Sequence, residues 1–177
     1  FDGVRKFPLI EGFYNTFNAG NWRPELNDCV DKITFREALE PNALFLLLDG
    51  VTTGGHKHDD GNSIPRLSQF DRIWLADNDY FKAPLKYHNS LSVLANGESG
   101  RLPDYVQCVL VDENSSCGVS VTEFREYARS DWRRALVWLK EQKCVLVLDR
   151  VTARENANYQ MCQFWHGVGE ATLDADG

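Results

Sequence analysis

The 177-residue chain lacks several features that mark other classes of protein. No hydrophobic run approaches the roughly 18 residues of a membrane-spanning helix. The net charge is −7, which argues against a nucleic-acid surface, because such surfaces need clustered Lys and Arg. A local basic cluster for an anionic sugar stays compatible with this charge, since a cluster can oppose the global sign. With 43% hydrophobic and 25% charged residues, the composition is typical of one soluble globular domain.

Cysteine pairs, nucleotide loops and linkers are also missing. The five cysteines include no CxxC pair, which excludes a zinc ribbon, and their odd number prevents complete internal pairing. Gly167-Val168-Gly169 is not a nucleotide-binding loop, because no third glycine follows at position 172 and no helical pattern comes after it. The sequence contains no internal repeat and no low-complexity tract.

Neither end has the character of a natural terminus. Phe1 is not an initiator methionine, and the first residues do not resemble a signal peptide. The sequence stops shortly after a strand-like run. We therefore expect this chain to be a piece of a longer polypeptide.

Short apolar or alternating runs, separated by polar turns, fill most of the sequence. Residues 43–48 form a continuous apolar run that suits a buried strand, and residues 90–94 alternate with a period of two. Residues 132–139 and 143–151 predict a hairpin around Glu141-Gln142. Further strands are expected at 72–76, 105–111, 118–121 and 158–165. Many short strands predict an all-β fold, an antiparallel β-sandwich of the jelly-roll kind.

Two segments are expected to lie outside this strand pattern. We expect residues 1–42 to form an irregular lead-in with short helical turns around 31–39, and residues 43–177 to form the sandwich, in truncated form. A helical turn or irregular connection is expected at 123–130.

The most informative run is Thr52-Thr53-Gly54-Gly55-His56-Lys57-His58-Asp59-Asp60-Gly61-Asn62-Ser63. It contains two of the four histidines, two residues apart. In an extended backbone, His56 and His58 would point to the same face. Imidazole is the commonest metal ligand and moves protons near neutral pH, so one histidine could bind a metal while the other acts as acid or base. The alternative is a polar surface loop whose histidines are incidental.

A second pattern follows downstream. The strand at 72–76 leads into Asp77, and His88 is followed by Asn89. This order of residues resembles the C-terminal β-sandwich domain of the heparinase II/III-like polysaccharide lyases. The resemblance continues in the late hairpin and covers roughly residues 43–166. It implies that the chain is part of a larger protein, in which an α/α-toroid domain precedes the sandwich. It also implies a periplasmic or secreted location.

The resemblance assigns roles to five residues. It implies that His56 is the catalytic histidine and that His58, Asp77 and His88 bind a divalent metal. Asp60 matches an acidic residue that would accept a hydrogen bond from His58 and orient it. Two imidazoles and one carboxylate suit Zn²⁺ better than Mn²⁺. The metal would then hold the strand that carries His56 and would not activate water.

Each ligand has a simpler alternative. Asp77 could merely end a strand, and Asn78 and Asp79 compete with it as ligands. His88 could be a core histidine bonded to a backbone carbonyl.

The implied reaction is β-elimination in an acidic polysaccharide, a glycosaminoglycan or alginate. A base removes the proton at C5 of a uronic acid, and a cation must neutralise the adjacent carboxylate. Arg66 and Arg72 are candidates for contact with the substrate. The family also uses a Tyr from the toroid domain, so we expect the isolated chain to have an incomplete site and the longer parent to be the enzyme.

Two other functions share parts of this pattern. A uronyl epimerase would use the same proton abstraction. A non-catalytic carbohydrate-binding or structural sandwich would have kept only the metal site.

Overall fold

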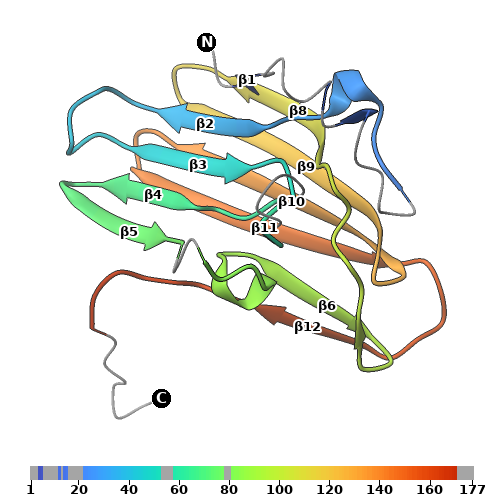
Figure 1. The fold of residues 1–177 in the computed structure, drawn as a ribbon. Coiled ribbons are helices and arrows are strands. Elements are labelled where there is room, and N and C mark those ends of the chain that lie inside the picture. The colour runs from blue at the N-terminus through green and yellow to red at the C-terminus, as the bar shows by residue number, and fades with distance from the viewer. Residues whose placement is uncertain are drawn as a thin grey trace.

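The computed structural model describes residues 4–5, 12, 14–15, 22–52, 58–77 and 81–170. Within them, the strands form three antiparallel sheets, with the orders β1-β2-β3-β4-β5, β11-β10-β9-β8 and β12-β6-β7. Figure 1 shows the first sheet in front of the second, with β6 and β12 below them. This arrangement confirms the expected all-β sandwich.

The first sheet contains β1 (Val4–Arg5), β2 (Lys32–Arg36), β3 (Phe45–Asp49), β4 (Arg66–Gln69) and β5 (Arg72–Ala76). The second contains β8 (Gln107–Glu113), β9 (Cys117–Tyr127), β10 (Ser130–Leu139) and β11 (Cys144–Ala153). The third contains β6 (Leu91–Ala95), β7 (Glu98–Ser99) and β12 (Tyr159–Gln163). Two short 3₁₀ helices, η1 (Leu26–Asp28) and η2 (Leu85–Tyr87), lie in the connections. In the described part of the chain, no helix is long and apolar enough to cross a membrane.

The core lies between the first and second sheets. Alternate residues of β2 and β3 are fully buried, as the two-residue period of a strand requires. The ring of Phe35 on β2 meets that of Trp138 on β10, with centroids 6.4 Å apart. Gly118 on β9 makes this contact possible, because a Cβ there would lie 2.8 Å from the Phe35 ring. Each fully buried large apolar side chain contributes about 1.5–3 kcal/mol to stability.

The expected strands at 43–48, 72–76, 90–94 and 105–111 correspond to β3, β5, β6 and β8, and the expected hairpin is β10 and β11. The run at 158–165 corresponds to β12.

Two expectations for the connections are wrong. Residues 31–39 contain the strand β2, which pairs with β3 from Lys32 to Arg36. Its alternating pattern covers only five residues and has Lys32 and Arg36 at its ends, which is too short to predict a strand from the sequence. Residues 123–127 belong to β9, and the polypeptide then turns tightly into β10. A charged residue at position 123 is unusual for a buried strand position. Glu123 is buried there because Arg125 and Arg133 bind its carboxylate.

Candidate metal centre and adjacent cleft

One imidazole and two carboxylates converge at one end of the first sheet. Asp60, Asp77 and His88 each offer a ligand atom, and these atoms lie within 4.8 Å of one another. Asp60 lies in the connection between β3 and β4, Asp77 follows β5, and His88 follows η2. Three connections that are distant in sequence therefore meet at a single point.

The centre contains buried polar atoms that make no hydrogen bond within the described part of the chain. Nδ1 of His88 lies 3.3 Å from Oδ2 of Asp77, and the side chains are 1% and 28% exposed. Within the described residues, neither Nδ1 of His88 nor Oδ1 of Asp77 makes a hydrogen bond. Buried groups of this kind cost free energy unless something satisfies them. A divalent cation would bind both atoms, so the residues present fit a metal.

The protonation of the centre reflects its burial. Burial, reinforced by the negative charge of Asp49, raises the pKa of Asp60 to about 7. Burial lowers the pKa of His88, but Asp77, Asp60 and the carbonyl of Ala83 outweigh this effect, and the net pKa is raised. Without a cation, the side chains of Asp60 and His88 therefore favour their protonated forms.

A tight turn presents Asp60. The carbonyl of Asp60 accepts a hydrogen bond from the amide of Ser63 at 2.9 Å. Asn62 within this turn has a left-handed φ of 63°. A Cβ on Gly61 would lie 2.1 Å from Oγ1 of Thr52 and 2.9 Å from the ring of Phe124. Position 61 therefore has no room for a side chain.

A buried arginine on the second sheet donates hydrogen bonds to this turn. Arg134 on β10 is fully buried, and Nη1 donates to the carbonyls of Asn62 at 2.8 Å and Asn89 at 3.2 Å. Its remaining donors bind both carboxylate oxygens of Asp149. Since Asn62 and Asn89 flank the ligand segments, the guanidinium fixes two loops of the centre at once.

Asn89 joins the same segments through its side chain. Nδ2 donates to the carbonyls of Ile64 at 2.9 Å and Ala76 at 3.2 Å, and Oδ1 accepts the amide of His166 at 2.5 Å. Asn89, the residue after His88, is thus bonded to the segment before β4, to the end of β5 and to the segment after β12.

The sequence pattern alone gives neither Asn89 nor Arg134 a role at this centre. The available signal at position 134 was a charged residue at an inward position of an alternating strand.

The residues predicted from the sequence are partly brought together. Asp77 and His88 meet as expected, while His58 lies beside them, with its ring centroid 5.8 Å from that of His88. Asp60 lies among the ligand atoms themselves, and its expected role in orienting His58 stays a prediction. His56 lies outside the described residues.

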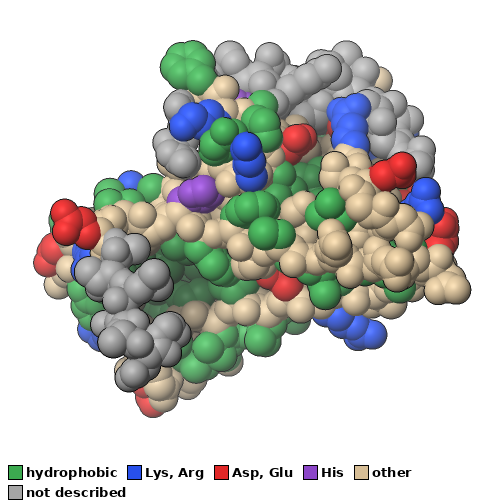
Figure 2. All heavy atoms as spheres, turned by 90° about the horizontal axis from the view of Figure 1, so that it is seen from below, with side chains coloured by type: hydrophobic (Ala, Val, Ile, Leu, Met, Phe, Trp, Pro, Cys, Tyr) green, Lys and Arg blue, Asp and Glu red, His purple; other side chains and the backbone are tan. Residues whose placement is uncertain are grey.

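A cleft of about 640 Å³ adjoins Asp77, and its walls include Arg72, Trp165 and His166. The guanidinium of Arg72 lies over the ring of Trp74, 4.6 Å from its centroid, and donates to the carbonyl of Val168 at 3.4 Å. Figure 2 shows histidine, basic and hydrophobic side chains together on the face seen from below.

Arg66 lines a separate hollow of about 420 Å³ with Arg36 and Glu40. Of the two arginines predicted to contact substrate, Arg72 is therefore the one beside the metal centre.

Comparison with known proteins finds similarity at the level of structure alone. No family model matches the chain, and no curated protein matches its sequence. Among solved structures, heparinase III matches with a TM-score of 0.59 and 15% identity, over 71% of this chain and 22% of that one. The heparan sulfate lyase HepC from Pedobacter heparinus matches with a TM-score of 0.59 and 17% identity, over 84% of this chain and 25% of that one. The chain thus spans about a quarter of the length of these lyases and shares the fold of the part that it matches.

Proposed function

We propose that the chain is the β-sandwich part of a lyase that cleaves a uronic-acid-containing polysaccharide by β-elimination. The observation that carries the proposal is the convergence of Asp60, Asp77 and His88 at the edge of this particular sandwich. A fold shared with a heparan sulfate lyase supports the substrate class. A periplasmic or secreted location belongs to the same proposal, since acidic polysaccharides of this kind are extracellular substrates.

In the proposed reaction, a base removes the proton at C5 of the uronate. The electron pair left behind forms the C4–C5 double bond, the bond from C4 to O4 breaks, and the departing oxygen takes up a proton. His56 is assigned to the transfer of the C5 proton. Arg72 is assigned to the substrate carboxylate, because its guanidinium lines the cleft beside Asp77. A preceding α/α-toroid domain would complete the set of acid and base groups.

The metal centre has a structural role in this proposal. Asp60, Asp77 and His88 would hold the ion, with His58 beside them. An ion at this point supplies positive charge that ties three connections together, and its binding energy adds to folding stability. The set of one imidazole and two carboxylates accepts Zn²⁺, and its majority of oxygen ligands makes Mn²⁺ a closer competitor than two imidazoles would.

The test compares the full-length protein that carries this chain with the chain alone. Both are incubated with heparan sulfate, chondroitin, hyaluronan and alginate, and absorbance of the unsaturated uronate is recorded. We expect product from the full-length protein only, and loss of product in its His56→Ala variant. An exposed substitution, Lys143→Ala, is the matched control.

The outcomes separate the competing functions. An epimerase would incorporate solvent deuterium at C5 without forming an unsaturated product. A non-catalytic sandwich would bind the polymer and change nothing in it. Full activity of the His56→Ala variant would remove His56 from the mechanism.

A further inference from the structure

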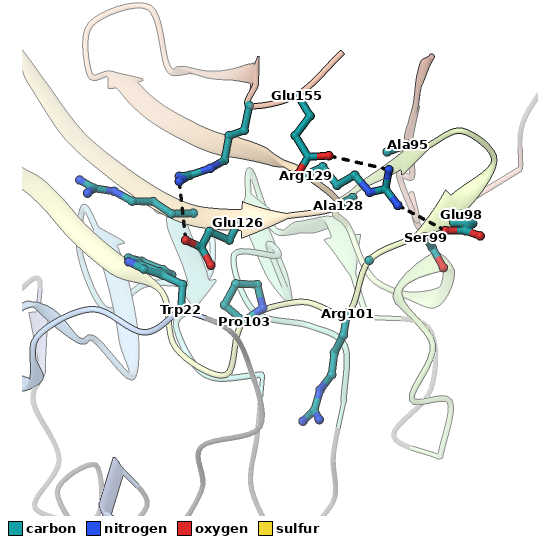
Figure 3. Close-up of a pocket in the computed structure, with 13 residues that line it drawn as sticks. Trp22, Ala95, Glu98, Ser99, Arg101, Pro103, Glu126, Ala128, Arg129 and Glu155 are labelled. Carbon is teal, nitrogen blue, oxygen red and sulfur yellow. Dashed lines mark ion pairs between the residues drawn. The ribbon is translucent and has the colours of Figure 1, made fainter. Parts of the chain in front are cut away.

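A second cleft, of about 520 Å³, lies around the turn that joins β9 to β10. This turn is at the opposite end of the second sheet from the β8–β9 and β10–β11 turns. Figure 3 shows Trp22 and Glu126 on one side, Arg129 between Glu98 and Glu155 on the other, and Pro103 between the two sides. This volume falls within the range of small-molecule binding sites. The cleft's walls include four arginines and three glutamates, a net positive balance in a chain whose net charge is −7.

Arg129 is the arginine best placed to accept a ligand. Its guanidinium lies 3.9 Å from the carboxylate of Glu98 and 3.8 Å from that of Glu155, and both distances exceed hydrogen-bond length. Ion pairs this open and exposed contribute little to stability. An anionic ligand could therefore replace them, and the planar fork of an arginine suits a carboxylate or a sulfate.

The backbone that carries Arg129 is strained. Ala128 and Arg129 have φ values of 47° and 59°, although a turn of this kind normally uses Asn or Gly there. Main-chain contacts keep the conformation in place: the carbonyl of Arg129 accepts the hydroxyl of Tyr159 at 2.7 Å and the amide of Arg154 at 3.0 Å. A large charged residue at such a position costs free energy, and strain of this kind gathers at functional sites.

The cleft is continuous with the surface beside the metal centre. A neighbouring hollow of about 590 Å³ shares Ser99, Gly100 and Arg101 with it and extends to Asp59. Asp59 in turn lies within electrostatic range of Arg101, His58 and His88. Adjacent hollows therefore extend along the surface from Asp59, beside the metal centre, to Arg129.

We propose that the cleft around Arg129 and Trp22 binds an acidic sugar unit, bearing a carboxylate or a sulfate, of a chain that also passes the metal centre. The guanidinium of Arg129 binds the anionic group, and the indole of Trp22 offers an apolar face to the sugar ring. The identity of the polymer rests on the proposed function, whereas the binding itself does not require catalysis.

The test is equilibrium binding of a heparan sulfate hexasaccharide to this chain, measured by calorimetry at low salt, with cellohexaose as the neutral probe. The decisive variant is Arg129→Gly, because glycine accepts the left-handed φ while removing the guanidinium. Arg150→Ala removes the same charge from an exposed position on β11 and is the control. We expect Arg129→Gly to weaken binding at least tenfold without lowering the melting temperature, and Arg150→Ala to change binding less than twofold.

The proposal is overturned if the two variants lose affinity equally, if cellohexaose binds as well, or if the hexasaccharide does not bind. Its failure is distinct from that of the proposed function. If the full-length protein forms no unsaturated product but Arg129→Gly still weakens binding, the cleft stands and the lyase reaction falls. If product forms while Arg129→Gly binds normally, only the cleft falls.

Discussion

Arg134 on β10 and Asp149 on β11 face each other in register and form a two-point ion pair, with Nε to Oδ1 at 2.8 Å and Nη2 to Oδ2 at 2.9 Å. Nε1 of Trp132 donates to the same Oδ1 at 2.8 Å. Since Arg134 is fully buried, Asp149 and the two loop carbonyls are what compensates its desolvation.

Breaking this ion pair should lower the free energy of unfolding more than a substitution at an exposed position does. We expect Arg134→Ala to lower the free energy of unfolding by about 3–5 kcal/mol, because it removes the positive partner of the Asp149 carboxylate and the side-chain donor to the carbonyls of Asn62 and Asn89. Urea denaturation measures the loss. Arg150→Ala, on the same hairpin but exposed, should change stability by less than about 0.5 kcal/mol. Equal effects of the two substitutions would contradict the role given to Arg134.

Substitutions of Asp60 and His58 should affect metal affinity to different extents. We expect Asp60→Asn to weaken Zn²⁺ and Mn²⁺ binding more than tenfold, and His58→Ala to weaken it less, because Asp60 lies among the converging ligand atoms. Competition with a chromophoric chelator measures the affinities, and Asp77→Asn is the positive control. The reverse order would favour the ligand set expected from the sequence, with Asp60 orienting His58.

Gly61 should be needed for both stability and metal binding. We expect Gly61→Ala to lower the melting temperature and the Zn²⁺ affinity together, because the new Cβ would push against Thr52 and Phe124 and displace Asp60. Gly97→Ala is the control: at its φ of 81° a Cβ brings strain of roughly 1–2 kcal/mol, but the space around it is open. A Gly61→Ala variant with unchanged metal affinity would show that the turn adapts.

Alkaline pH should destabilise the fold through Tyr105. Burial, reinforced by the charge of Asp104, raises the pKa of Tyr105 from 10.0 to about 12. Because the folded-state pKa lies above the unfolded value, the stability that depends on neutral Tyr105 is complete below pH 10. It is lost as the pH rises toward 12. We expect Tyr105→Phe to flatten this part of the curve of unfolding free energy against pH. An unchanged slope would show that other groups cause the loss.

The fold was largely predictable because strand patterns are local. Continuous or alternating apolar runs identified β3, β6 and the late hairpin, and the number of short strands identified the sandwich. The two segments predicted wrongly, β2 and the end of β9, have charged residues at positions where the apolar alternation is short or ends. The buried carboxylate of Glu123 is neutralised by Arg125 on the same strand and by Arg133 on β10, and no local rule can anticipate the partner on the neighbouring strand.

The candidate centre was predictable in residue type more than in arrangement. Asp77 and His88 were singled out from their order along the chain, and they do meet. The position of Asp60 depends on the turn at Gly61, and the alignment of the loops depends on Arg134 and Asn89. The hydrogen bonds from Asn89 to Ile64 and from Arg134 to Asn62 join residues 25 and 72 positions apart, so they appear only once the sheets are assembled.

The contact between Phe35 and Gly118 makes two positions on different sheets depend on each other. A Cβ at position 118 would overlap the Phe35 ring, and a smaller residue at position 35 would leave a cavity beside Trp138. Neither position can change alone without loss, but a larger residue at 118 can accompany a smaller one at 35. Homologous sequences should therefore show the two positions varying together, because the distance between the sheets limits their combined side-chain volume.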